Sequence, residues 1–238
     1  MIIDRLLKIS LVLLSIAYVF FEIRKDGIFS DITSAVLVSL LTLLYIRTTK
    51  IRKPYMLLFF ISYSFSKIMA IQFDEIFINQ LYYQYYICNF LFMLAYFFLI
   101  LRCLITWDFK KIIKQFPATL LVLIMLGVFC VTLITDTAKA QLTPSQYILE
   151  LIYNIVIMLL LSVALINYMY LDDKKSILFF IGTMFIFLSE MLQLAYYYVS
   201  DIPQVAAIYS VFIVLAFAFL YLQSRLKHQK LEFDYLKT

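Results

Sequence analysis

Two ionisable residues of opposite charge lie inside long apolar stretches of this chain. Lys67 belongs to the segment 57–72, LLFFISYSFSKIMAIQ, and Glu190 belongs to the segment 178–193, LFFIGTMFIFLSEMLQ. A charged side chain near the middle of a membrane helix costs roughly 2.5–3.5 kcal/mol on insertion scales, so it normally faces a partner or a water-filled cavity. We therefore expect Lys67 and Glu190 to face the interior of a helix bundle and to pair, directly or through water.

A catalytic site built on these two groups would perform acid–base chemistry. Desolvation favours the protonated form of a glutamate, which makes Glu190 a candidate proton donor, whereas a nearby lysine opposes that effect. The hydroxyls of Ser66 and Ser189 have no histidine base within the membrane, because the only histidine is His228 in the polar tail. A histidine-activated serine and a histidine-ligated zinc site inside the membrane are therefore excluded, and no metal or cofactor is expected.

Further polar side chains are expected near the two charges. At ~1.5 Å per residue, Lys67, Glu190, Asn89 and Asn154 fall in one layer of a ~30 Å hydrocarbon core, in its external half. The candidate catalytic residues are Glu190 and Lys67, and the candidate ligand-binding residues are Ser66, Asn89, Asn154, Ser189 and Gln193. A structural alternative stays open, in which the charges bridge the two halves of the bundle and the asparagines hydrogen-bond between helices.

The composition predicts the helices that must position these residues. Hydrophobic residues make up 65% of the 238 residues and charged residues 15%, whereas a soluble domain is nearer half apolar and a quarter charged. Apolar runs of about 20 residues span the hydrocarbon core as helices. Eight such runs are present, at about 5–22, 31–47, 54–73, 82–105, 116–135, 146–170, 176–199 and 203–224.

Basic residues concentrate on alternate connections between these runs. Sixteen of the 20 Lys and Arg residues fall on one side and three on the other, while Lys67 lies within a run. Cytoplasmic loops carry the Lys and Arg excess. We therefore predict eight crossings of the cell (inner) membrane, with both termini in the cytoplasm.

The two halves of the chain resemble each other. Residues 94–101 match residues 215–222 at an offset of 121, and residues 59–61 match residues 179–181 at an offset of 120. The match requires three additional residues before Ser189, so the two charges need not face alike. An even number of crossings in each half makes the repeats parallel, related by an axis along the membrane normal.

The predicted fold class is therefore an all-α, polytopic membrane bundle of eight helices. We expect a single transmembrane domain over residues 1–224, built from a first repeat at about 1–110 and a second at about 111–224. Residues 225–238 form a predicted cytoplasmic tail that mixes basic and apolar side chains, which suits contact with anionic lipid or with a protein.

Two local motifs resemble those of YhhN-type membrane proteins, the lysoplasmalogenase-like family. In that family a Lys-Pro pair opens a helix that carries a Gly-Asp, and a later helix reads roughly G-x-x-x-F-x-x-S-D. The corresponding residues here are Lys53-Pro54, and then Gly182, Phe185 or Phe187, and Ser189-Glu190. The resemblance implies an eight-helix bundle that hydrolyses the vinyl-ether bond of lysoplasmalogens.

The resemblance also implies site residues, with two departures. Tyr153 and Tyr209 fall where the family tends to carry tyrosines, which adds them to the ligand-binding candidates. The family's Gly-Asp is Ser66-Lys67 here, and its later Asp is Glu190. Vinyl-ether cleavage needs a positioned acid, and a second carboxylate can handle water, so the lysine removes half of the family's pair. A shared fold does not carry the activity with it.

Three functional hypotheses follow. The first is a membrane protein that binds or hydrolyses a lysolipid in an intramembrane polar cavity, with membrane lipids as its expected partners. The second is a small secondary transporter, which predicts discontinuous helices at the midplane. The third is a non-catalytic membrane module that contacts a protein partner through its tail. No partnership with nucleic acid is expected.

Overall fold

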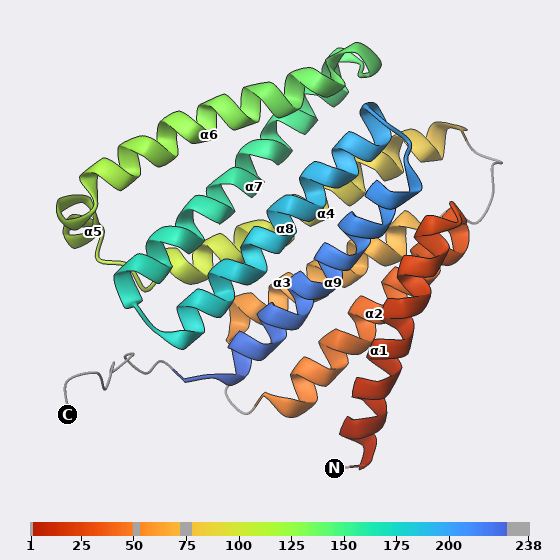
Figure 1. Ribbon diagram of the computed structural model, residues 1–238, viewed down its shortest axis with the longest axis horizontal. Helices are drawn as coiled ribbons and strands as arrows, with labels where there is room; N and C mark the ends of the chain where they lie inside the picture. Colours follow the sequence, from red (N-terminus) through yellow and green to blue (C-terminus); the bar gives the residue numbers. More distant parts are fainter. Residues whose placement is uncertain (1, 50–52, 72–77, 228–238) are drawn as a thin grey trace.

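A computed structural model describes residues 2–49, 53–71 and 78–227 of the chain, and it is predominantly helical over these ranges. The long helices lie side by side as a bundle, with the short α5 at one end of α6 (Figure 1). In chain order the helices are α1 (Ile2–Ile23), α2 (Gly27–Thr48), α3 (Pro54–Ala70), α4 (Ile78–Leu104), α5 (Phe109–Gln115), α6 (Pro117–Ala138), the 3-10 turn η1 (Lys139–Gln141), α7 (Pro144–Leu171), α8 (Lys174–Tyr198) and α9 (Pro203–Arg225).

Each predicted apolar run coincides with one long helix, with ends that agree within a few residues. Seven of the helices in the described ranges are long and apolar enough to cross a membrane, so the chain is a helical, multi-pass membrane protein. The helix α3 has 17 residues and packs between α2 and α4; its crossing stays a prediction. The helix α5 was not predicted, and the side chain of Asp108 caps it by accepting a hydrogen bond from the backbone of Lys111.

All four prolines of the chain stand at the start of a helix. Pro54, Pro117, Pro144 and Pro203 begin α3, α6, α7 and α9. A proline in the first turn needs no backbone N–H partner, whereas a proline in the interior breaks or kinks a helix. The eight long helices run without interruption over the described residues, so the discontinuous helices that the transporter reading predicts are not found there.

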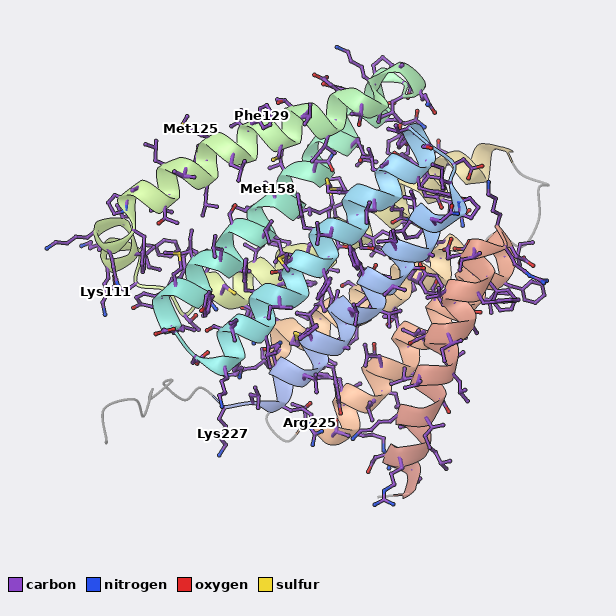
Figure 2. All side chains as sticks on the ribbon, viewed as in Figure 1. Lys111, Met125, Phe129, Met158, Arg225 and Lys227 are labelled. Carbon is purple, nitrogen blue, oxygen red and sulfur yellow. The ribbon has the colours of Figure 1, made fainter. Side chains whose placement is uncertain are left out.

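The outer faces of the bundle suit lipid and its ends suit water. Met125 and Phe129 on the outer face of α6 leave 65% and 61% of their surface exposed, which is favourable only in an apolar solvent. Lys111, Arg225 and Lys227 lie at one end of the bundle (Figure 2). We call this the basic end; α3 and α8 begin there, and α1 begins and α9 ends on the same side (Figure 1). The opposite end is called the outer end.

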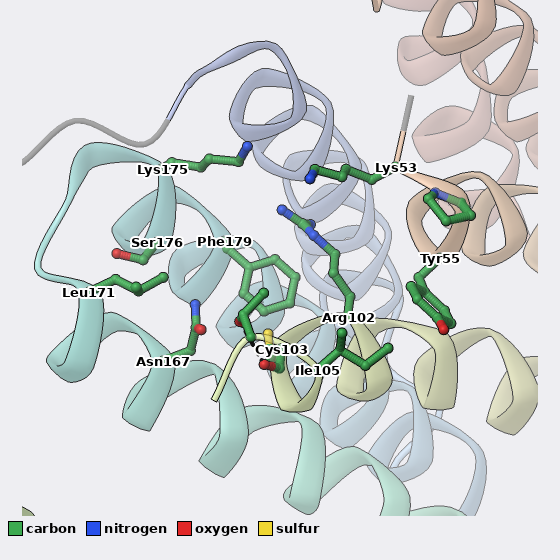
Figure 3. A pocket seen from close by; sticks show the side chains of 12 residues that line it. Lys53, Tyr55, Arg102, Cys103, Ile105, Asn167, Leu171, Lys175, Ser176 and Phe179 are labelled. Carbon is green, nitrogen blue, oxygen red and sulfur yellow. Dashed lines mark hydrogen bonds between the residues drawn. The ribbon is translucent and has the colours of Figure 1, made fainter. Parts of the chain in front are cut away.

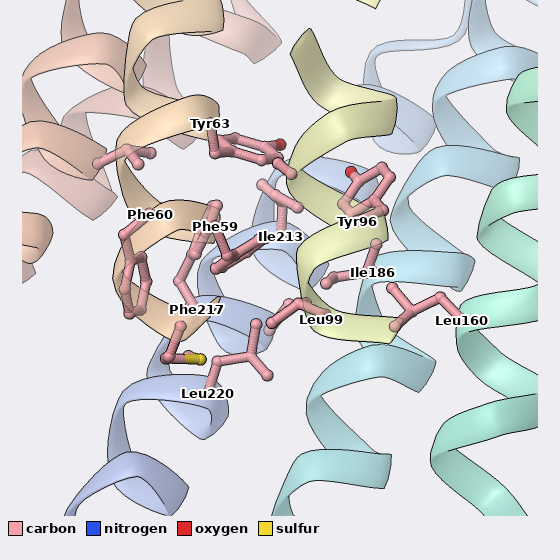
Figure 4. Packing of buried hydrophobic residues seen from close by; sticks show 14 of the residues in the cluster. Phe59, Phe60, Tyr63, Tyr96, Leu99, Leu160, Ile186, Ile213, Phe217 and Leu220 are labelled. Carbon is pink, nitrogen blue, oxygen red and sulfur yellow. The ribbon is translucent and has the colours of Figure 1, made fainter. Parts of the chain in front are cut away.

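The centre of the bundle is packed with aromatic and aliphatic side chains from α3, α4, α7, α8 and α9 (Figure 4). Phe59 and Phe60 are fully buried. The ring of Phe217 on α9 packs edge-on against Tyr63 at a centroid distance of 4.8 Å and lies 6.1 Å from Phe59. This core joins α3 of the first half to α9 of the second half and fixes the position of the helices that carry the candidate site.

Two hydrogen bonds occupy matched places in the two halves of the chain. Ser66 on α3 donates to the backbone carbonyl of Cys88 on α4 at 2.9 Å, and Ser189 on α8 donates to the carbonyl of Tyr209 on α9 at 2.8 Å. Cys88 and Tyr209 are separated by the offset of 121 residues at which residues 94–101 match residues 215–222. The duplication itself stays a prediction, and this pair of bonds supports it.

Candidate functional site

A polar cavity of about 180 Å³ opens near the outer end, between α4, α7 and α8. Five of the nine predicted site residues line it, and all of them are polar: Asn89, Tyr153, Asn154, Glu190 and Gln193. The other lining residues are Tyr85, Glu150, Leu194, Tyr197 and Tyr198. Three of the four residues that the helical rise placed at one depth, Asn89, Asn154 and Glu190, therefore line one cavity.

Two tyrosine hydroxyls hold the carboxylate of Glu190 in this cavity. The hydroxyl of Tyr153 on α7 donates to Oε2 at 3.0 Å, and the hydroxyl of Tyr96 on α4 donates to Oε1. Tyr96 is fully buried, and its ring meets that of Tyr153 edge-on at 6.2 Å. Each carboxylate oxygen thus has a fixed donor from a different helix, which sets the orientation of Glu190.

A second carboxylate, Glu150, enters the same cavity from α7. The side-chain amide of Asn154 donates to Glu150 Oε1 at 3.4 Å and to Thr135 Oγ1 on α6 at 3.1 Å. Glu150 lies near enough to Glu190 for their charges to interact. Asn154 is 2% exposed, and its Oδ1 accepts no hydrogen bond from any described residue. This face of α7 therefore offers a carboxylate and an unused acceptor.

Lys67 is placed differently from the expectation. It does not line the cavity, and its Nζ lies 5.6 Å from the ring centroid of Phe92. Within the described ranges no ion pair joins Lys67 to Glu190, although its charge acts on both Glu190 and Asp31. The three additional residues before Ser189 turn the helix by about 300°, so the two charges lie on different faces of equivalent helices.

Three other predicted residues hold helices together outside the cavity. Ser66 and Ser189 donate to the backbone of the neighbouring helix. The hydroxyl of Tyr209 on α9 donates to Glu22 Oε2 on α1 at 2.5 Å, and the other oxygen of Glu22 accepts from Ser30 on α2 at 2.6 Å. None of these three predicted ligand-binding residues lines the cavity.

Glu150 and Tyr96 are the important residues that the sequence analysis did not select. Glu150 precedes Tyr153 by three positions and Asn154 by four, a spacing that puts all three on neighbouring positions of one helix face. That spacing was a usable signal. Tyr96 sits in an aromatic-rich run, YFF, with no mark that separates it from packing residues.

The described lining of the cavity therefore combines two carboxylates, four tyrosines and two kinds of amide group, and contains no Lys or Arg. Such a site can bind a polar or cationic group, and it can donate and accept protons through two different carboxyl groups. No family model, no curated protein and no solved structure matches the chain. The resemblance to YhhN-type proteins accordingly stays a prediction.

Proposed function

We propose that this multi-pass membrane protein binds a single-chain ether lipid and hydrolyses its vinyl-ether bond at the cavity between α4, α7 and α8. The observation that carries the proposal is the presence of Glu150 and Glu190 in one cavity. The resemblance to lysoplasmalogenase-like proteins implies two acids, and Lys67 replaces one of them. Glu150 supplies a carboxylate from a different helix, so a pair of acids is available. We place the basic end in the cytoplasm, as its Lys and Arg excess favours.

The two carboxylates are suited to different steps. Glu190 accepts two hydroxyl hydrogen bonds, which fix the orientation of its carboxylate and offset part of the cost of burying its charge. Glu150 accepts one long bond from an amide and lies beside the charge of Glu190, so we assign the role of proton donor to Glu150 in place of Glu190, which the sequence analysis favoured. Two carboxyl groups with different surroundings are a common arrangement for acid and base roles.

In the proposed reaction, Glu150 protonates the vinyl carbon that is not bonded to oxygen. The resulting oxocarbenium ion is stabilised by the ionised Glu190. Glu190 then removes a proton from the water that adds to this ion, which gives a hemiacetal. In the collapse of the hemiacetal, the bond from its carbon to the glycerol oxygen breaks and the hydroxyl proton moves to that oxygen, which releases a fatty aldehyde and the free alcohol; the proton held by Glu190 then passes to Glu150. The net change is the addition of one water molecule.

An apolar groove beside the cavity supports a lipid substrate. A space of about 630 Å³ lies between α6 and α7 and is lined almost wholly by apolar side chains. Leu151 and Ile155 of α7 line this groove, whereas their neighbours Glu150 and Asn154 line the polar cavity. An amphiphile with its chain in the groove and its polar part in the cavity would contact both faces of α7.

The direct test is turnover by the purified protein in detergent. We expect release of fatty aldehyde from a lysoplasmalogen and none from the matched lysolipid with a saturated alkyl ether, because only the vinyl ether forms the cation. Substitution of both acids, Glu150→Gln with Glu190→Gln, should abolish aldehyde release.

The matched control is Asp136→Asn, which removes a carboxylate at the same end of the bundle but outside the cavity. It should retain full turnover. If the folded wild-type protein releases no aldehyde, the catalytic proposal is wrong. A lipid that mass spectrometry detects with the purified wild type, but not with the double variant, would then support a binding role without catalysis.

A further inference from the structure

A second pocket, of about 210 Å³, lies at the basic end of the bundle, far along the same helices from the acidic cavity. The first turns of α3 and α8, the last turns of α4 and the end of α7 enclose it. Figure 3 shows the amines of Lys53 and Lys175 directed toward one another, with the guanidinium of Arg102 beside them. Three cationic groups from three helices therefore converge on one space.

Among the residues that the structure describes, no carboxylate lines this pocket. Lys175 leaves only 7% of its surface exposed and forms no ion pair with any described residue. The positive charges of Arg102 and Lys53 both act on it. A buried cation beside other cations is costly unless an anion neutralises it.

Neutral groups, rather than acids, position Arg102. Its Nη2 donates to Oε1 of Gln223 on α9 at 2.8 Å, and its Nη1 contacts the sulfur of Met56 at 3.5 Å. The guanidinium carbon lies 5.0 Å from the ring centroid of Phe179. These contacts fix the plane of the guanidinium and leave its full charge available to the pocket, as in anion sites that use arginine as a rigid fork.

Asp173, the acid whose charge acts on Lys175, caps a helix terminus. Asp173 interacts electrostatically with Lys175, but its Oδ1 accepts the backbone N–H of Ser176 at 2.6 Å as the cap of α8, and it does not line the pocket. The helix α3 also begins here, at Lys53 and Pro54, without a side-chain cap. The positive end of its dipole adds to the attraction for an anion.

We propose that this pocket binds a phosphate group, held by Lys53, Arg102 and Lys175. Its size admits a phosphate ester, and its position at the basic end of the bundle allows two sources, the headgroup of an anionic phospholipid or a soluble phosphate. The charge of a phosphate monoester, close to −2, is matched by three cations of which two are flexible lysines. This inference is independent of the chemistry proposed for the acidic cavity.

The test uses the full-length protein in two settings. In detergent, thermal unfolding is followed as inorganic phosphate is titrated at constant ionic strength, with sulfate-free chloride buffer as the reference. In nanodiscs of phosphatidylcholine, the same unfolding is followed with and without phosphatidate. A saturable rise in Tm with inorganic phosphate identifies a free phosphate as sufficient, and a rise only with phosphatidate identifies the lipid headgroup.

Variants separate the pocket from general attraction to the basic end. Lys53→Gln and Lys175→Gln are each expected to weaken phosphate or phosphatidate binding at least tenfold. Lys110→Gln removes the same charge from an exposed site at the same end, outside the pocket, and should leave binding unchanged. An equal loss in all three variants, or no Tm response of the wild type in either setting, overturns the proposal.

The two proposals can fail separately. Lys53 is exposed and far from the acidic cavity, so Lys53→Gln should keep its turnover of lysoplasmalogen if that activity exists. Phosphate binding by a protein without any turnover would retain this inference and remove the catalytic one.

Discussion

The acidic cavity and the basic pocket lie at opposite ends of the same three helices, α4, α7 and α8. They differ in which groups compensate their charged side chains. In the acidic cavity, Glu190 has hydroxyl donors on both oxygens. In the basic pocket, Lys53 and Lys175 have no acceptor of opposite charge among the described residues. In the first site the protein itself supplies the donors to Glu190, whereas the second site gains from an external anion.

An apolar layer separates the two sites. Leu99, Leu160 and Ile186 lie between them on α4, α7 and α8, each with no more than 1% of its surface exposed (Figure 4). Close packing of this kind leaves few voids that could hold water. The comparison shows that one bundle can hold two polar sites of opposite charge when an apolar core separates them.

The largest expected effect concerns the donors that complete the acidic site. Removing both hydroxyls, by Tyr96→Phe with Tyr153→Phe, should lower lysoplasmalogen turnover about 100-fold, because a misplaced catalytic group costs on the order of 10²-fold. Turnover at saturating substrate in detergent is the measurement. Tyr147→Phe removes a hydroxyl at the same end that bonds Asp136 instead and should have no effect. Unchanged turnover in the double variant would show that Glu190 needs no donors.

A smaller effect is expected from substituting the glycines at two helix contacts, one of them on α8, which lines both sites. A Cβ on Gly182 of α8 would lie 3.1 Å from Leu220 of α9, so Gly182→Ala should overpack this contact and lower the free energy of unfolding by about 1–2 kcal/mol. A Cβ on Gly127 would meet Met158 at an ordinary 3.6 Å. Gly127→Ala should therefore gain helix propensity and stabilise by up to about 1 kcal/mol. Chemical unfolding of both variants tests whether their signs differ.

The next prediction concerns Lys175, which forms no ion pair with any described residue. Lys175→Met should raise the stability of the protein without phosphate by about 1 kcal/mol, because an apolar side chain of similar length replaces an unpaired buried cation. The same variant should lose the rise in Tm on addition of phosphate. A Lys175→Met protein that is less stable than the wild type in phosphate-free buffer would mean that the protein already neutralises this lysine.

The smallest effect concerns the ion pair between Lys25 and Asp201, which joins the α1–α2 connection to the α8–α9 connection at the outer end. The hydrogen bond from Lys25 lowers the pKa of Asp201 below its usual 3.8. A lowered folded-state pKa contributes stability that is present above the usual pKa and is lost as the pH falls through the folded-state pKa. Between pH 5 and pH 3 the wild type should lose slightly more Tm than Asp201→Asn. Lys25→Gln should behave like Asp201→Asn. If Tm falls equally with pH in the wild type and both variants, the ion pair does not contribute to stability.

The sequence by itself determined the helices and the depth of the polar residues. Hydrophobic run length fixes a membrane helix, because every backbone polar group must be paired within it, and all eight runs are helices in the structure. Depth follows from the constant rise per residue, and three of the four residues that it placed in one layer, Asn89, Asn154 and Glu190, line one cavity. The proline positions likewise set the helix starts.

Only the tertiary structure decided which partners these residues have. The rotation of each helix about its axis depends on packing against its neighbours, and it turns Lys67 toward Phe92 while Tyr96 and Tyr153 reach Glu190. The same packing assembles Lys53, Arg102 and Lys175, which lie at least 49 positions apart in sequence, into one pocket. Their convergence has no local signal, because each lies near a helix end where a basic residue is ordinary.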